Sequence, residues 1–393
     1  MKRFGWILVV LLATSPAWAA RNVTVQQLKD LLTADQQAKK TDVEVATELK
    51  QIVLTEELTT VAMNGLAPLV PGAATLEQIY VLEAKSAVLP PPATDIPTTP
   101  APDAAAQKAL LDKALDYAGK TYAQLPTVTA TKTTIRFQDD VTAMASSSGQ
   151  NGGAVLDASS DPNLANAGHF VHYINTAQTA TSIHNGIEDN PLVKDKTRWG
   201  ANGYIALLGQ SPVLSTVLQE ASGAGKLSWL RWETVNGKTA AVFSFTVEKK
   251  KSHYAVNYCC FPNLDSSGIM QQSLPGAKMP GTNTTPNGNL QTTTEWKNFK
   301  ATVPYHGEVF IDPDTGIVLR LITQLDFKNT DLVHLEDQRI DYLPVTVGGK
   351  TLVLPAKSIV NTEVVPNGDS GGGKFILRHT FFTSEYKSYQ AGS

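Results

Sequence analysis

The stretch YHGEVFIDPDTGIVLRL, residues 305–321, decides the fold class of this chain. Two runs of apolar and β-branched residues flank a turn in which Pro313 presets the backbone angle and Gly316 supplies a left-handed position. The pattern predicts an antiparallel hairpin. The large apolar residues of this region carry odd numbers, and we expect the turn to bring them onto one face: Tyr305, Val309, Ile311, Ile317, Leu319, Leu321, Leu325 and Phe327.

The two faces of this hairpin differ in polarity. The opposite face carries the polar residues His306, Glu308, Arg320, Gln324 and Asp326, so we expect that face to meet solvent. Burying each large apolar side chain of the first face stabilises the fold by roughly 1.5–3 kcal/mol. Such a face does not stay bare, so a helix predicted at residues 103–124 must cover it, either directly or across a cavity.

Most other strands also come in pairs. LSWLRWETV and KTAAVFSFTV flank the Asn-Gly pair at 236–237, a strong hairpin signal, and YLPVTVGGKTLVLPAKSIV turns at the Gly-Gly pair at 348–349. Further strands are predicted in TVTATKTTIRF, HYAVNYCC and FILRHTFFTSEY, and one short helix, SPVLSTVLQEA, interrupts the series. Sequential hairpins predict an α+β fold with a large, curved antiparallel β-sheet, mostly a meander, packed on a helix.

The first twenty residues, MKRFGWILVVLLATSPAWAA, have the parts of a secretory signal peptide. Lys2 and Arg3 give a positive start, an apolar run follows, and Ala-Trp-Ala at 17–19 is a cleavage site. The apolar run is too short to span a bilayer, and no cysteine stands at the cleavage site to carry a lipid. We therefore expect cleavage of residues 1–19 after Ala19, and a periplasmic or secreted mature chain without a membrane anchor.

The mature chain divides at a proline-rich stretch. Residues 21–89 carry apolar residues at helical spacing, with Thr41 as an N-cap and a further helix across Ala74–Ala87, which predicts a helical N-terminal module. Residues 90–102 are rich in proline and poor in apolar residues, which predicts an extended, semi-rigid linker. We assign the sheet and its helix to residues 103–393. The Ser/Gly/Asn-rich residues 146–163 and the polar residues 263–294 are predicted loops.

Charge and cysteine content narrow the class of partner. Removal of Lys2 and Arg3 with the signal peptide leaves 31 basic and 36 acidic residues. This mild acidity gives no reason to expect a nucleic-acid partner. Cys259 and Cys260 are adjacent, which rules out ordinary disulfide geometry. Two free thiols at a strand end are favoured, and a vicinal disulfide or a link to another chain stays an alternative.

No motif indicates catalysis, a cofactor or a metal. His169 and His172 lie on a predicted strand that points them to opposite faces, and Asp312-x-Asp314-x-Gly316 lacks the glutamate of a calcium loop. Residues 209–213 lack the second glycine of a hydrolase elbow, so Ser211 is assigned as a helix N-cap. We therefore expect a non-enzymatic protein with no cofactor and no metal; a hydrolase acting through Ser211 is the remaining enzymatic alternative.

Two resemblances follow from these blocks. The order of helix, strand and antiparallel strands, with an ID-P-x-T-G-x-V-x-R hairpin and a P-V-x-V-G-G-K hairpin, resembles the lipoprotein-carrier (LolA/LolB-like) superfamily over residues 103–393. That resemblance implies an incomplete antiparallel barrel (a half-barrel) that folds over helices and holds acyl chains inside. Blocks such as LSWLRWE, SHYAVNY and VGGKTLVLPAKSIV are similar, over nearly the whole mature chain, to uncharacterised exported bacterial proteins, which imply no particular activity.

These observations predict a ligand-binding protein. We expect an apolar cleft between sheet and helix that holds a lipid or the acyl chains of a lipoprotein, lined by Phe243, Phe245, Val309, Ile311, Leu319, Leu321, Leu110 and Leu115. The alternative is an envelope structural or protein-interaction module with a filled core and no small ligand. That alternative would bind an envelope protein through helices 21–89 or an open sheet edge.

Overall fold

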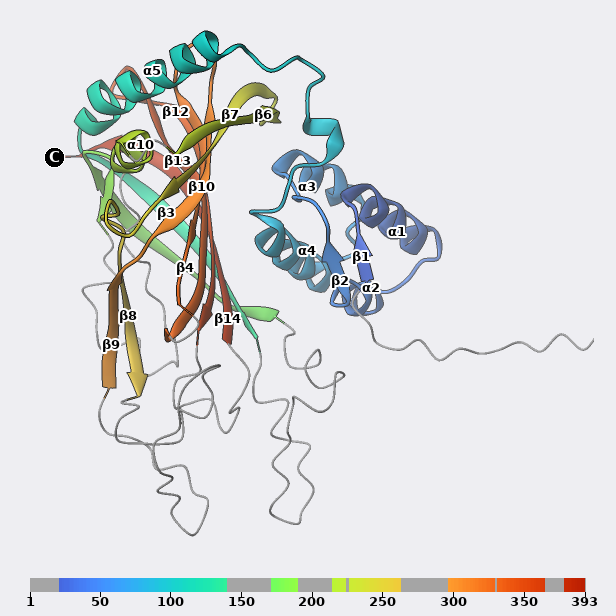
Figure 1. The fold of residues 1–393 in the computed structure, drawn as a ribbon. Coiled ribbons are helices and arrows are strands. Elements are labelled where there is room, and N and C mark those ends of the chain that lie inside the picture. Colours follow the sequence, from blue (N-terminus) through green and yellow to red (C-terminus); the bar gives the residue numbers. More distant parts are fainter. Residues whose placement is uncertain are drawn as a thin grey trace, which may run out of the picture.

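The computed structural model describes residues 21–139, 171–189, 214–223, 226–262, 296–328, 331–364 and 378–392 (Figure 1). The predicted signal peptide and the predicted loops at 146–163 and 263–294 lie outside these ranges. The described α-helices are α1 (Val25–Gln37), α2 (Asp42–Leu49), α3 (Thr60–Leu66), α4 (Ala73–Ser86), α5 (Ala104–Lys120) and α10 (Leu214–Gly223). Within the described ranges, none of these helices is long and apolar enough to cross a membrane.

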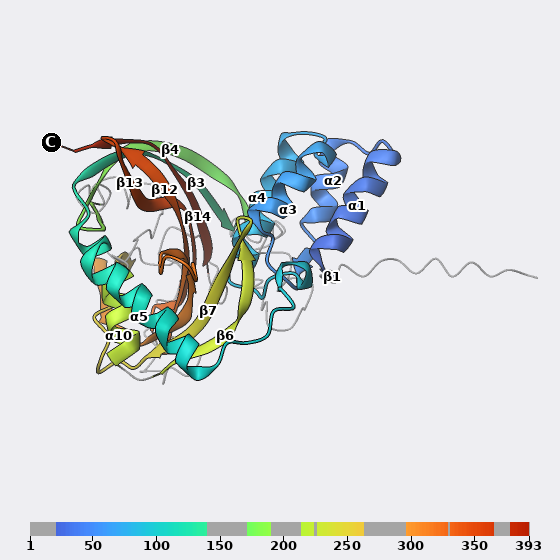
Figure 2. The same ribbon diagram turned by 90° about the horizontal axis from the view of Figure 1, so that it is seen from above.

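A ten-stranded antiparallel sheet dominates the fold and confirms the predicted α+β class. Its strands pair in the order β5-β4-β3-β14-β13-β12-β11-β10-β7-β6. Figure 2 shows this sheet curving around α5 and α10 without closing into a barrel. The bounds of its strands are β3 (Val128–Asp139), β4 (Val171–His184), β5 (Ile187–Asp189), β6 (Leu227–Val235), β7 (Lys238–Val247), β10 (Tyr305–Ile311), β11 (Val318–Leu325), β12 (Val333–Val347), β13 (Lys350–Val364) and β14 (Arg378–Ala391).

The predicted hairpin turns are confirmed by their backbone angles. Asn236 and Gly237, which join β6 to β7, have φ of 51° and 79°, and Gly348 and Gly349, which join β12 to β13, have φ of 56° and 77°. Positive φ at both central residues is the geometry that matches the twist of paired strands. These turns are local, so short stretches of sequence were enough to predict them.

Gly316, in the turn between β10 and β11, has a second reason to be glycine. Its φ is +75°, and an added Cβ would lie 2.7 Å from the backbone carbonyl of Lys113 in α5. We expect Gly316→Ala to lower the free energy of unfolding by about 1–2 kcal/mol for the backbone angle and by a further ~1–3 kcal/mol for the clash. Urea unfolding measures the loss.

The matched control is Gly237→Ala, because Gly237 has a similar φ of +79° and no atom within 4 Å of its added Cβ. The Gly237→Ala variant should lose only the part of the unfolding free energy that comes from the backbone angle, about 1–2 kcal/mol. Equal losses in the two variants would contradict the close packing of α5 on this turn.

A β-bulge in β11 changes which residues of the opening hairpin share a face. Val309 pairs with Leu321 and Ile311 pairs with Val318, so Leu319 is an extra residue in the ladder. It therefore points to the opposite face. The predicted common face of odd-numbered residues is wrong for Leu319, because a bulge reverses the alternation beyond it.

The chain departs from the predicted meander after β7. Strands β8 (Ala255–Pro262) and β9 (Trp296–Thr302) pair with each other in a separate two-stranded sheet, and β10 returns to pair with β7. Tyr254, Val256 and Tyr258 are fully or almost fully buried and join the core cluster beneath α5 and α10. The two-stranded sheet thus packs on the same side as these helices.

Helices α5 and α10 cover the inner, concave face of the large sheet. Asp103 caps α5 by accepting the Ala106 N–H at 2.8 Å. The buried residues of α5 are Leu110, Ala114 and Ala118, spaced four apart on one side of the helix, so that side faces the sheet. Val217 and Ala221 of α10 are fully buried in the same cluster.

The helical module packs on the outer, convex face of the sheet (Figure 2). Its helices α1 and α2 begin with capping boxes, Thr24 with Gln27 and the predicted cap Thr41 with Glu44. The module also contains two short parallel strands, β1 (Arg21–Val23) and β2 (Ile52–Leu54). Ile52, within the stretch 21–89 that was predicted to be helical, therefore lies in a strand. Contacts of α4 with β4, β13 and β14 fix the module on the sheet.

For Arg320, this packing corrects the expectation that the polar face of the opening hairpin meets solvent, whereas the side chains of His306 and Asp326 are 45% exposed as expected. Arg320 on β11 is only 2% exposed. Val81 and Ala84 of α4 lie in one apolar cluster with Phe137 and Phe381 of the sheet. The proline-rich segment also touches the sheet, because Trp232 Nε1 on β6 donates to the carbonyl of Pro100 at 2.9 Å.

Candidate functional site

The residues predicted to line the apolar cleft belong, except for Leu319, to one tightly packed core. One cluster contains Phe243, Phe245, Val309, Ile311, Leu321 and Leu110, with Leu115 partly buried at its margin, whereas Leu319 lies in a second cluster with Phe310 on the outer face. Val309 and Ile311 have no exposed surface, and Phe243 has 1%. A void that admits water leaves accessible surface on its walls. These side chains therefore pack directly against protein.

The other half of the inner face is different. Strands β12, β13, β14, β3 and β4 direct a mixed set of side chains to this side: Gln338, Ile340, Ser358, Val360, Phe382, Ser384, Lys132, Thr134, Asn175, Ala177 and Thr179. The hydrogen bond of 2.8 Å between Thr134 and Ser384 shows that β3 and β14 share this face. Gln338 and Ile340 on β12, and Asn175, Ala177 and Thr179 on β4, are half-buried although they point inward.

Two cations of β3 lie on this mixed half. Lys132 Nζ is 2.8 Å from Glu188 Oε1 and 5.1 Å from the ring centre of Tyr386. The Arg136 guanidinium lies 5.9 Å from the ring centre of Phe382. Lys132 is 9% exposed and Arg136 is 8% exposed. Cations this buried are uncommon unless paired, and here aromatic rings supply part of their environment.

A buried carboxyl group joins the two sheets across the inner side. Glu336 of β12, 2% exposed, accepts a hydrogen bond from Tyr254 Oη at 3.1 Å and another from Tyr258 Oη. Burial raises the pKa of Glu336 to about 7, in spite of these two donors. The sequence showed the alternation of Tyr254 and Tyr258, but no local signal pairs them with a residue about eighty positions away.

A second buried network lies between the helical module and the outer face. Arg320 Nη1 is 3.0 Å from Glu57 Oε2, and Arg339 Nη1 is 2.5 Å from Glu57 Oε1. Asp341 accepts from both guanidinium groups, at 2.5 Å from Arg320 and 2.8 Å from Arg339. Although burial opposes ionisation, the two arginines hold the pKa of Asp341 at about 2. Lys357 forms a further ion pair with Glu83 of α4.

Glu233 of β6 lies at the edge of this network. Burial raises its pKa to about 7, although Arg231 Nη2 lies 2.6 Å away. Arg320, Arg339, Asp341 and Glu233 lie on strands whose alternation the sequence predicted. Their pairing with the helical module could not be predicted, because Glu57 and Arg320 are 263 residues apart.

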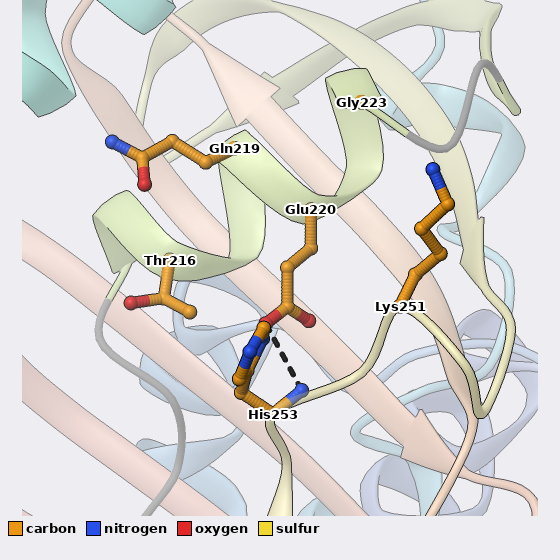
Figure 3. A pocket seen from close by; sticks show the side chains of 6 residues that line it. All are labelled: Thr216, Gln219, Glu220, Gly223, Lys251 and His253. Carbon is orange, nitrogen blue, oxygen red and sulfur yellow. Dashed lines mark hydrogen bonds and ion pairs between the residues drawn. The ribbon is translucent and has the colours of Figure 1, made fainter.

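A surface pocket of about 570 Å³ lies between α10 and the segment before β8 (Figure 3). Its lining residues are Thr216, Gln219, Glu220, Gly223, Lys251 and His253. Glu220 points from the helix onto His253 and accepts from its backbone N–H at 3.0 Å and from its Nδ1 at 2.6 Å. The other carboxylate oxygen accepts from Tyr305 Oη at 2.7 Å.

The described ranges contain no cluster of three or more His, Cys, Asp or Glu that could hold a metal ion. Of the residues weighed for chemistry, His169 and Ser211 lie outside the described ranges, as do the side chains of Cys259 and Cys260.

Comparison with protein-family models, with curated proteins and with solved structures finds no match in any of the three.

Proposed function

We propose that this protein is a non-enzymatic, extracytoplasmic binding protein for an amphipathic ligand with an acyl chain. The ligand lies against the inner face of β12, β13, β14, β3 and β4. It does not lie between the packed residues around Phe243 and the helix α5. Export follows from the predicted signal peptide, so it is part of the same proposal.

The supporting observation is the partial exposure of side chains that point inward. Ile340 and Ala177 are half-buried on the concave side, whereas Val309 and Ile311, on the same side, have no exposed surface. Residues at the centre of the filled part of the core resemble the second pair. A face that retains accessible surface on its inner side is available to a ligand.

The chemistry of this face suits a ligand with an apolar and an anionic part. Ile340 and Ala177 offer apolar contacts, and Lys132 and Arg136, 9% and 8% exposed, place positive charge on the same face. Glu188 neutralises Lys132 in part. Hydroxyl groups such as those of Thr134 and Ser384 already bond to each other, so their polarity is satisfied without a ligand.

A tryptophan placed on each side of β4 tests the proposal. Ala177 is half-buried and faces inward, paired with Thr134, whereas Ala180 is exposed and faces outward, paired with Thr131. We expect Ala177→Trp to weaken binding of a fluorescent fatty acid by about tenfold or more, equivalent to ~1.4 kcal/mol, because the indole occupies the space of the ligand. Ala180→Trp should bind as the wild type does.

Circular dichroism would verify that both variants fold. Equal binding by the two variants would place the ligand elsewhere, and failure of the delipidated wild type to bind any fatty acid would refute the proposal.

An envelope interaction module is the second candidate function. It is favoured by large apolar residues that the helical module exposes, among them Val43 at 69% and Val61 at 63%. Cross-linking in native cells separates the two functions, since a single protein partner with no bound lipid would support the second.

A further inference from the structure

We propose that the pocket between α10 and residues 251–253 binds a small oxyanion, a carboxylate or a phosphate. This site is separate from the inner face of the sheet and does not depend on the acyl-ligand proposal. Its lining residues come from the helix and from the segment that leads into β8 (Figure 3).

Glu220 fixes the orientation of His253. A carboxylate only accepts hydrogen bonds, so the 2.6 Å contact requires that Nδ1 of His253 carries the hydrogen. The other ring nitrogen, Nε2, is then the one left for a ligand. The side chain of His253 is 80% exposed, whereas that of Glu220 is only 7% exposed. A buried carboxylate thus holds an exposed imidazole in one orientation.

The carboxylate of Glu220 is itself satisfied. Its Oε1 accepts from the backbone and ring of His253, and its Oε2 accepts from Tyr305. It has little need of a further cation.

Lys251 supplies positive charge beside His253. Its side chain extends along the pocket towards Gly223 (Figure 3). It forms no ion pair with any residue that the structure describes, whereas the nearby Lys226 is already paired with Glu248. The hydroxyl of Thr216 and the amide of Gln219 add neutral donors to the lining. Lys251 brings a positive charge to a lining whose carboxylate, Glu220, is already bonded to His253 and Tyr305, and this balance favours an anion over a metal ion.

Titration of the full mature chain with inorganic phosphate, and separately with acetate, tests this site. We expect saturable binding with a dissociation constant on the order of 1 mM, and a shift of the His253 Nε2 resonance in nitrogen NMR. Lys251→Gln should weaken phosphate binding about tenfold, because it removes a charge-assisted hydrogen bond. Tighter binding of phosphate than of acetate would assign the site to phosphate groups, and the reverse to carboxylates.

The matched control is Lys250→Gln, which removes the same charge from the neighbouring position, outside the lining. It should change the affinity less than about twofold, since exposed charges at longer range are screened. Equal weakening by the two variants would show that only the net charge matters. That result, or an unchanged His253 resonance at about 20 mM of either anion, would overturn the proposal.

Discussion

Replacement of Glu57 by alanine should lower the free energy of unfolding by about 3–5 kcal/mol, because it leaves buried charge without a partner. Both oxygens of this carboxylate contact guanidinium groups, those of Arg320 and Arg339. The side chains of the two arginines are 3% and 0% exposed. Asp341 and Glu233, whose Oε1 lies 3.8 Å from Arg320 Nη1, would then remain to balance the two buried guanidinium groups. Urea denaturation followed by far-ultraviolet circular dichroism measures the loss.

Glu48→Ala is the matched control within the same module. Glu48 also forms an ion pair, with Lys40, but its side chain is 40% exposed. Exposed pairs contribute about 0–1 kcal/mol, so this variant should unfold nearly as the wild type does. Similar losses in the two variants would mean that the outer-face network does not hold the helical module on the sheet.

Stability should fall as the pH rises from about 4.5 to 7, with Glu336 as a main cause. The folded protein holds the pKa of this carboxyl at about 7, above its usual value of 4.5. Between these values the unfolded chain releases the proton while the folded chain keeps it, so rising pH favours unfolding. The contribution of Glu336 is present in full below about pH 4.5 and is lost by pH 7, a change on the order of 3 kcal/mol.

The variant Glu336→Gln isolates this contribution. An amide keeps the shape and an acceptor for Tyr254 or Tyr258 but does not titrate in this range. Glu233 and Asp337, with pKa values raised by burial to about 7 and about 6, act in the same direction and remain in the variant. We therefore expect a shallower decline and not a flat one.

Asp341 titrates in a separate range. Its pKa of about 2 makes its contribution to stability present above about pH 4 and lost as the pH falls towards 2.

Urea titration at several pH values between 4.5 and 7.5 measures the unfolding free energies of Glu336→Gln and the wild type. If both free energies fall with pH at the same slope, the raised pKa of a buried Glu336 is contradicted.

Local signals were sufficient for much of the fold. Asn236-Gly237 and Gly348-Gly349 take the left-handed angles that their residue types favour, and Asp103 caps its helix with its own side chain. Each of these features depends on a few neighbouring residues. Alternation along β7 and β10 then placed Phe243 and Val309 in the core.

Features set by distant partners could not be predicted in this way. The bulge that moves Leu319 to the outer face depends on the register of β10 with β11. The burial of Arg320 depends on Glu57, in another module. The polar face of the hairpin looked like a solvated surface because charged residues on a strand usually are exposed. A compensating charge far away in sequence leaves no trace in the hairpin itself.

The candidate site was predictable only in part. The concave side and the helix that covers it followed from the hairpins, and Leu110 of that helix lies in the inner core. Which part of that side retains accessible surface did not follow, because it depends on how α10 and the β8–β9 sheet fill the space over β7 and β10. Ala177 and Ile340 carried no signal of their own, since a half-buried strand residue looks the same in sequence on either face.

Native mass spectrometry of the mature protein, purified without detergent, tests the acyl-ligand function most directly. The wild type should carry an added mass that organic solvent removes and that fragmentation identifies as an acyl lipid. Ala177→Trp should carry much less of it, and Ala180→Trp should carry as much as the wild type. A wild-type protein that shows only the mass of its polypeptide, and that takes up no fatty acid afterwards, would contradict the account.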